Sequence, residues 1–132
     1  MRLFLACPCL LGATACAGKT PLGPTVARAD RFTLAPGATA DIEGTGVRVE
    51  FVAVAGDSRC PADVVCIQLG EAVVHLRVYD GMITAYELRT GNPDRGSVMH
   101  HGLRIELVEV QPYPFSNRRI RPSEYRVTLV TR

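Results

Sequence analysis

Residues 72–79 read AVVHLRVY. The apolar side chains at positions 72, 74, 76 and 78 alternate with a second set that ends on His75, Arg77 and Tyr79. Successive side chains of a β-strand point to opposite faces of the sheet, so this alternation predicts a strand with one face in the core.

The next residues along the chain predict a hairpin and its register. Asp80-Gly81 is a turn signal between this strand and the next apolar run. A two-residue turn would place Glu87 on the apolar face, whereas one extra bulge residue leaves that face uncharged. We therefore predict the bulged register. Its pairs are Val74 with Leu88, Leu76 with Tyr86 and Val78 with Thr84.

The same period of two recurs over residues 47–54, 103–108 and 125–130, and more briefly over 32–34 and 39–43. Pro36-Gly37 and Gly44-Thr45-Gly46 separate the first three strands at hairpin distances. We predict an all-β fold, an antiparallel β-sandwich of about seven strands, with a small β-barrel as the alternative.

The composition fits one globular domain, which we place at residues 31–132. The chain has 132 residues, of which 47% are hydrophobic, and it lacks tryptophan, so its core must consist mainly of smaller aliphatic side chains. Its 15 basic and 13 acidic side chains give a net charge of +2, which offers no basis for binding nucleic acid.

The N-terminus has the three parts of a secretory signal peptide, predicted over residues 1–15. Arg2 supplies a positive charge, residues 3–11 are mostly apolar, and residues 12–15 are small. The apolar run is about half of the roughly 20 residues that a membrane-spanning helix needs.

Residues 13–16, Ala-Thr-Ala-Cys, resemble the lipobox of bacterial lipoproteins, which implies lipidation at Cys16. Lipoproteins prefer leucine where this chain has Ala13, so simple cleavage after Ala15 is the alternative. Residues 16–30 contain the lipidated cysteine and a Gly- and Pro-rich segment that predicts a flexible tether. We expect a protein anchored by lipid to a bacterial membrane in the cell envelope, or else a soluble periplasmic or secreted one.

Residues 57–70 read DSRCPADVVCIQLG and contain Cys60 and Cys66. In an exported domain this pair predicts a disulfide that closes a compact loop. A redox pair would have the spacing C-x-x-C, and two thiolates make only half a zinc site. The residues around the first cysteine are the candidate partner-binding loop: Asp57, Ser58, Arg59 and Pro61.

This stretch, with Gly70 and the strand after it, resembles a group of small, poorly characterised bacterial exported proteins and lipoproteins with an Asp-Ser-Arg-Cys-Pro loop and a second cysteine. Pro112, Pro114 and the chain end around Tyr125 fit the later part of their pattern. The resemblance implies a β-sandwich-like envelope domain and brings no known activity with it.

Histidine and methionine side chains offer weak candidates for a metal site. Met99, His100 and His101 are adjacent, with His75 and Met82 elsewhere, and copper is the natural ion for such ligands in an oxidising compartment. Adjacent histidines on a strand point to opposite faces, however, so both rarely bind one ion. We favour a solvated loop here and expect no cofactor.

Catalysis is disfavoured because no base is placed beside Ser58, and we expect Asp57 and Ser58 to hydrogen-bond to the turn backbone while Arg59 pairs with a carboxylate. The leading hypothesis is a non-enzymatic envelope module that binds or supports an envelope protein or cell-wall polymer. A second is a protease inhibitor that presents the Cys60–Cys66 loop, and a third is periplasmic copper binding. Arg118, Arg119 and Arg121 are either solvated or contact anionic lipid or polymer.

Overall fold

The alternating stretch at residues 72–79 forms β5 (Ala72–Tyr79) in the computed structural model, which describes residues 23–132. This strand lies between β4 (Val47–Asp57) and β6 (Ile83–Arg89) and pairs antiparallel with both. Its inward side chains at positions 72, 74, 76 and 78 are all buried. The alternation therefore predicted both the strand and its core face.

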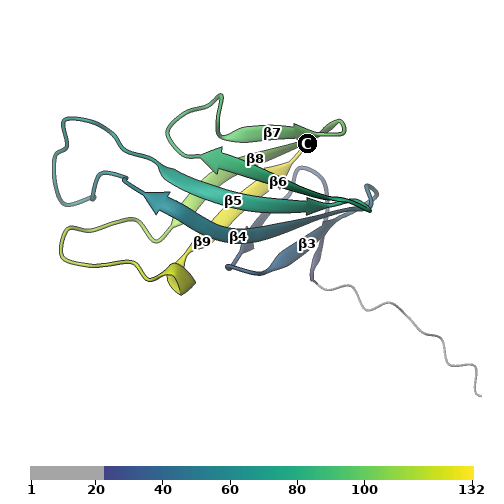
Figure 1. Ribbon diagram of the computed structural model, residues 1–132, viewed down its shortest axis with the longest axis horizontal. Coiled ribbons are helices and arrows are strands. Elements are labelled where there is room, and N and C mark those ends of the chain that lie inside the picture. The colour runs from purple at the N-terminus through teal and green to yellow at the C-terminus, as the bar shows by residue number, and fades with distance from the viewer. Residues whose placement is uncertain (1–22) are drawn as a thin grey trace, which may run out of the picture.

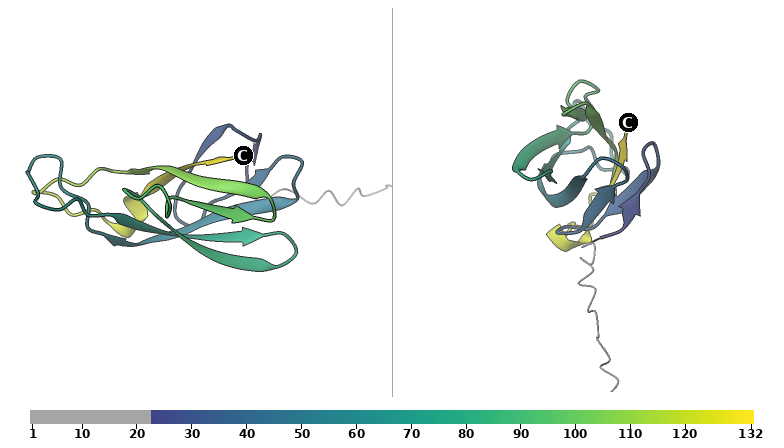
Figure 2. Two further views of the ribbon diagram at one scale, coloured as in Figure 1. Left: turned by 90° about the horizontal axis from the view of Figure 1, so that it is seen from above. Right: turned by 90° about the vertical axis from the view of Figure 1, so that its right-hand side faces the viewer.

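Two sheets stack on one another, as Figures 1 and 2 show. One sheet has the strand order β1-β3-β4-β5-β6 and the other has the order β2-β9-β8-β7. Neighbouring strands are antiparallel except β1 and β3, which are parallel. The other strands are β1 (Thr25–Val26), β2 (Arg31–Leu34), β3 (Thr39–Ile42), β7 (Ser97–His100), β8 (Leu103–Gln111) and β9 (Arg126–Thr131).

The predicted antiparallel sandwich is confirmed, because the two sheets stay separate and do not close into a barrel. The described chain has nine strands where we expected about seven. Of the two additional strands, β1 has only two residues, and in β7 the apolar residues Val98 and Met99 are adjacent and do not alternate with polar ones. One turn of 3₁₀ helix, η1 (Pro122–Glu124), precedes β9.

The bulged register of the β5–β6 hairpin is also confirmed. Val74 pairs with Leu88, Leu76 with Tyr86 and Val78 with Thr84. The third loop residue, Met82, lies beyond Gly81, whose φ of 97° is readily adopted only by glycine. Avoiding a buried carboxylate was thus a sufficient criterion for the register.

Alternation fails where strands bulge. In β4 a register shift between Phe51 and Ala53 removes Ala53 from the core, whereas an unbroken period of two over residues 47–54 would place it on the same face as Val49 and Phe51. A bulge inserts an extra residue and reverses the facing of the later residues in the strand. A similar shift in β8, between Leu107 and Glu109, leaves Leu107 half-buried and makes Val110 the buried residue.

One predicted hairpin is wrong. The turn at Gly44-Thr45-Gly46 does join the paired strands β3 and β4. The turn at Pro36-Gly37 instead carries the chain from one sheet to the other, since β2 pairs with β9. The two cases look alike in the sequence because both turns are rich in glycine and only the distant partner differs.

The domain begins earlier than the predicted boundary at residue 31. Thr25–Val26 pairs with β3, and the amide of Ala29 donates to the carbonyl oxygen of Thr131 at 2.7 Å. Residues 25–30 thus belong to the folded domain and not to a tether. The predicted signal peptide and Cys16 lie outside the described residues. Within residues 23–132, no helix combines the length and the apolar character needed to cross a membrane.

Candidate functional site

Two long loops project beyond the sheets at one end of the sandwich, opposite the end from which the chain leads back to its N-terminus (Figures 1 and 2). The first, residues 58–71, joins β4 to β5 and contains both domain cysteines. The second, residues 112–121, joins β8 to η1. The first loop contains Ser58, Arg59 and Pro61 of the predicted partner-binding set, and Asp57 is the last residue of β4 before it, so this end of the molecule is the candidate site.

A buried ion pair forms the base of the site. The Asp57 carboxylate accepts hydrogen bonds from Nε and Nη2 of Arg59 at 2.8 and 2.7 Å, and from the hydroxyl of Tyr125 at 2.9 Å. The same guanidinium donates to the carbonyl oxygens of Val110 and Pro112 at 2.7 and 2.9 Å. One arginine thereby ties the start of the first loop to the start of the second.

These contacts shift two pKa values. Burial opposes ionisation of Asp57, but hydrogen bonds from Arg59 and Tyr125 outweigh it and lower the pKa of the carboxyl below its ordinary value. Burial, together with the hydrogen bond to Asp57, raises the pKa of Tyr125 to about 12. The carboxylate is therefore charged and the phenol neutral around neutral pH.

Ser58, Gly70 and Glu71 hold the two ends of the first loop together, and we call these residues the neck of the loop. The Ser58 hydroxyl donates to the Glu71 carbonyl oxygen at 3.1 Å and accepts from the Glu71 amide at 3.0 Å. A Cβ atom on Gly70 would lie 1.6 Å from the carbonyl oxygen of Ser58, so only glycine allows the two sides to approach this closely. The Ser58 hydroxyl thus hydrogen-bonds to the loop backbone, as predicted from the sequence.

The disulfide and the second loop brace the first loop. Cys60 and Cys66 form the predicted disulfide, with Cα atoms 5.9 Å apart. The Ala62 amide donates to the Pro114 carbonyl oxygen at 2.9 Å, and Asp63 accepts a hydrogen bond from the Ser116 amide at 2.8 Å. Several independent contacts therefore hold residues 60–66 in one shape.

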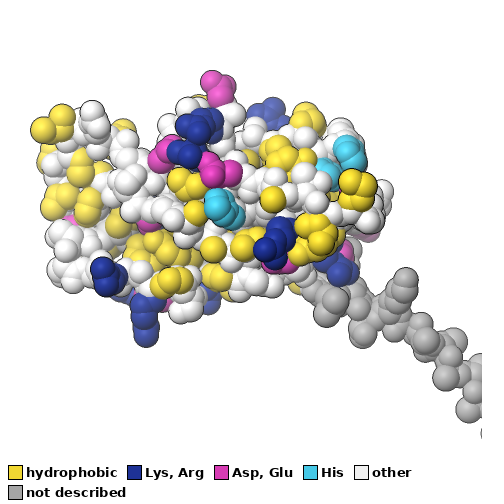
Figure 3. Space-filling model, in the orientation of Figure 1, with side chains coloured by type: hydrophobic (Ala, Val, Ile, Leu, Met, Phe, Trp, Pro, Cys, Tyr) yellow, Lys and Arg dark blue, Asp and Glu magenta, His cyan; other side chains and the backbone are white. Residues whose placement is uncertain are grey.

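An apolar tip lies on this braced frame, and we define it as Val64, Val65, Ile67 and Leu69. The relative exposures of Val65, Ile67 and Leu69 are 102%, 104% and 90%. Tyr113 and Phe115 of the second loop are about half exposed. Figure 3 shows hydrophobic side chains at the surface of this end of the molecule, with others over the sheets. Large aliphatic side chains held in water by a rigid frame are typical of a contact surface.

The structure corrects the predicted set of partner-binding residues. Asp57 and Arg59 were predicted to belong to a partner-binding loop, but their side chains are 11% and 7% exposed and bind each other. Of the other two residues in the predicted set, Ser58 is exposed and Pro61 is half-buried. The apolar tip was missed, although the alternation V-C-I-Q-L at residues 65–69, in a loop too short to return to the core, was a usable signal.

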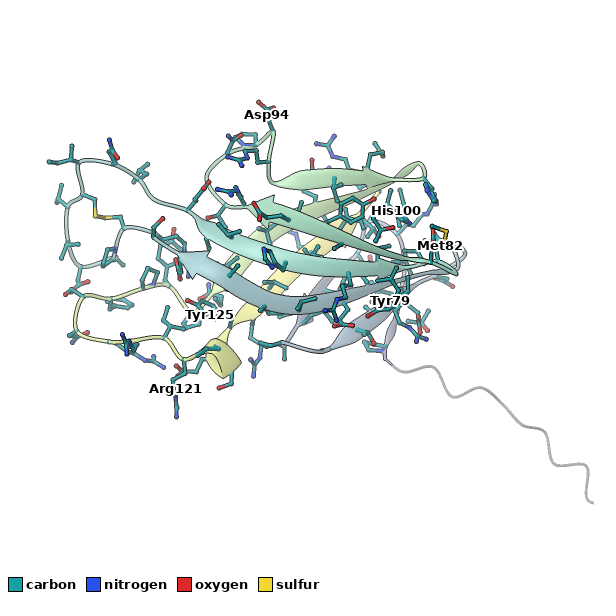
Figure 4. All side chains as sticks on the ribbon, viewed as in Figure 1. Tyr79, Met82, Asp94, His100, Arg121 and Tyr125 are labelled. Atoms are coloured by element: carbon teal, nitrogen blue, oxygen red, sulfur yellow. A yellow bond between two sulfur atoms is a disulfide. The ribbon has the colours of Figure 1, made fainter. Side chains whose placement is uncertain are left out.

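A second cluster lies at the other end of the sandwich, where His100 and Met82 are labelled in Figure 4. Asp80, His100 and His101 have ligand atoms that all lie within 4.8 Å of one another. A hydrogen bond from His100 lowers the pKa of Asp80 below its ordinary value. We expected the adjacent histidines to point apart, and this is wrong because β7 ends at His100 and His101 lies in the turn with a φ of 45°.

The other candidates do not join either cluster. Met99 is exposed, with a relative exposure of 61%, on the face of β7 opposite to His100. His75 pairs with Glu87 at 3.3 Å. Arg118 and Arg121 both contact Glu124, at 2.6 and 3.7 Å.

Comparison with known proteins adds no assignment. No protein-family model, curated protein or solved structure matches the chain. A proposal for the function must therefore rest on the apolar tip and on the cluster of Asp80, His100 and His101.

Proposed function

We propose that this domain is a non-enzymatic binding module of the cell envelope, whose apolar tip contacts a partner protein. The observation that carries the proposal is the nearly complete exposure of Val65, Ile67 and Leu69 on a loop closed by a disulfide and braced by a second loop. Rigid loops lose little conformational entropy on binding, so such a frame favours affinity.

The chemistry of the tip favours a protein over an anionic surface. Residues 64–69 carry no charge, and the neighbouring Asp63 is engaged by Ser116. The nearby Arg118 and Arg121 share Glu124, which leaves Arg119 as the one exposed arginine of the second loop without a carboxylate partner among the described residues. A lipid surface or cell-wall polymer would be recognised by free cations, whereas an apolar groove on a protein needs none.

The placement of the tip agrees with an envelope role. The tip lies at the end of the sandwich remote from residue 23 (Figure 1). A chain anchored in a membrane through lipid at Cys16 would therefore present the tip away from its own anchor.

Photo-crosslinking tests the proposal. A photoreactive amino acid at Ile67 should yield a discrete protein adduct in the native cells, whereas the same group at Met82, an exposed apolar residue 75% accessible at the other end, should not. The Ile67 adduct should disappear when Val65→Asp is added. Because Val65 is fully exposed, this change should alter the free energy of unfolding by less than about 0.5 kcal/mol.

Three results would contradict the proposal. One is the same adducts from Ile67 and Met82, and another is an Ile67 adduct that persists in Val65→Asp. The third is adducts to lipid alone, together with binding to vesicles of anionic phospholipid, which would make the tip a membrane contact.

A protease inhibitor is the second candidate, and the specific observation in its favour is the exposure of Val65, Ile67 and Leu69 on a loop closed by a disulfide. A rigid loop that presents exposed side chains loses little conformational entropy when it enters a protease cleft. Inhibition assays on serine and cysteine proteases, with Ile67→Asp as the variant and Met82→Asp as the control, separate this candidate. Inhibition that survives Ile67→Asp would exclude it.

A further inference from the structure

Two turns at the end opposite the apolar tip bring three metal-ligating side chains together. Asp80 lies in the β5–β6 turn, while His100 and His101 lie where β7 turns into β8. Oδ2 of Asp80 is 2.8 Å from Nε2 of His100 and 3.0 Å from Nδ1 of His101. Residues about twenty positions apart in the sequence thus converge on one carboxylate oxygen.

The backbone conformation of the β7–β8 turn is what brings the two histidines together. In a continuous strand their side chains would point to opposite faces. His101 has a φ of 45°, in the left-handed region that residues other than glycine seldom adopt, and Gly102 follows with a φ of 81°. The reversal stacks the ring of His101 on that of His100, with centroids 4.4 Å apart.

A hydrogen bond with Tyr86 orients the ring of the buried His100. His100 is 1% exposed, and its Nδ1 lies 2.8 Å from the hydroxyl of Tyr86. A histidine that binds a metal through one ring nitrogen is commonly held by a hydrogen bond from the other. Since the carboxylate of Asp80 can only accept, Nε2 now carries the proton. An ion would take the place of that proton, and Nδ1 would then donate to the Tyr86 oxygen.

We propose that Asp80, His100 and His101 bind one divalent transition-metal ion of the zinc class, with a fourth position open to solvent. The His101 side chain is 81% exposed, so the ion would be accessible from outside. Tetrahedral coordination at about 2.0–2.1 Å separates ligand atoms by about 3.3 Å. The present distances of 2.8 and 3.0 Å need to widen by only a few tenths of an ångström.

Zinc calorimetry is the first test. The protein is the full-length chain without a histidine tag and with Cys7, Cys9 and Cys16 replaced by serine, so that only the Cys60–Cys66 disulfide remains among the cysteines. One Zn²⁺ should bind per chain. His101→Asn should weaken binding at least about tenfold, and asparagine tolerates the same left-handed backbone. His75→Asn is the matched control, because His75 is a half-exposed histidine on β5 that pairs with Glu87 outside the cluster, and it should change the affinity less than about twofold.

Two further readouts separate ligation from a merely structural role. Tyr86→Phe removes only the orienting hydroxyl and should weaken Zn²⁺ binding about tenfold while leaving the stoichiometry at one. With Cu²⁺ as a probe, electron paramagnetic resonance should report two imidazole nitrogens in the parent chain and one in His101→Asn. Circular dichroism of each variant without metal checks that the fold is unchanged.

The proposal is overturned if the parent chain binds no Zn²⁺ at millimolar concentration. It is also overturned if His75→Asn and His101→Asn weaken binding equally, or if the copper spectrum is the same in both. None of these outcomes depends on the apolar tip, so the metal site and the proposed binding module stand or fall separately.

Discussion

Asp57 and Arg59 are two residues apart in the sequence, yet their pairing depends on residues more than fifty positions later in the chain. Tyr125 completes the contacts of the carboxylate, and the carbonyl oxygens of Val110 and Pro112 complete those of the guanidinium. Burying two charges is costly unless their remaining hydrogen-bonding groups are satisfied. The satisfied pair fixes both loops at their base and so holds the apolar tip in place.

The phenol of Tyr125 makes this pair sensitive to high pH. Tyr125→Phe should lower the free energy of unfolding by about 1–2 kcal/mol near neutral pH, because the Asp57 carboxylate loses a donor. With a folded pKa of about 12, the contribution of Tyr125 is complete below about pH 10, where the unfolded phenol begins to ionise, and is lost as the pH rises toward 12.

Urea unfolding of the parent and of Tyr125→Phe at about pH 8 and about pH 11 measures the contribution of the phenol. The difference in the free energy of unfolding between parent and variant should be smaller at the higher pH. Tyr113→Phe is the control, since its hydroxyl makes no contact with Asp57 and the substitution keeps the ring that lies 5.1 Å from Cζ of Arg59. A parent-to-variant difference that does not change with pH would contradict the assignment.

At the scale of elements, the β4–β5 connection behaves as a rigid extension of the sheet. Ser58 and Glu71 continue the pairing of β4 and β5 beyond the last strand residues, Asp57 and Ala72. Gly70 permits this approach because a side chain there would meet the Ser58 backbone. The disulfide then closes the outer part of the loop, which adds roughly 2–3 kcal/mol in the chain-entropy account.

Gly70→Ala should therefore destabilise the domain by about 1–3 kcal/mol, because the new methyl group overlaps the Ser58 carbonyl oxygen. Gly56→Ala is the matched control, since a Cβ at that position meets nothing within 4 Å. Urea unfolding gives the free energies, and hydrogen exchange of the Ser58 and Glu71 amides reports the neck itself. Equal effects of the two substitutions would refute the role given to Gly70.

At the scale of the whole molecule, the sandwich separates two chemistries. The apolar tip lies at one end, and the Asp80–His100–His101 cluster lies at the other, near the side from which the chain leads to its N-terminus (Figures 1 and 4). The sheets between them are the scaffold. For a chain held through its N-terminus, the tip would be the end of the described domain more distant from residue 23 (Figure 1).

Fractionation tests the anchor that this arrangement assumes. The parent chain, expressed in a bacterium, should sediment with membranes and carry acyl mass on Cys16, whereas Cys16→Ser should move to the soluble fraction. Each buried methylene of the lipid contributes about 0.8 kcal/mol to membrane binding. Cys9→Ser, within the apolar run, should still sediment with membranes. An unmodified, soluble parent chain would instead support simple cleavage after Ala15.

Local signals in the sequence were enough to predict the main strands, the β5–β6 register and the cysteine pair. These depend on alternation, turn residues and spacing within a few positions, and the cost of burying one carboxylate was enough to choose between registers. The bulges in β4 and β8 marked the limit of that local information, because an extra residue leaves no signal in the composition.

Three features became visible only in the folded chain. They are the exclusion of the alternative β-barrel, the buried pairing of Asp57 with Arg59, and the meeting of Asp80 with His100 and His101. Each depends on contacts between distant segments, such as β2 with β9 or Asp57 with Tyr125. The alternation of one strand gives the direction of its apolar face but not the partner that covers it. That partner is selected by packing all the apolar faces at once, which is a property of the whole chain.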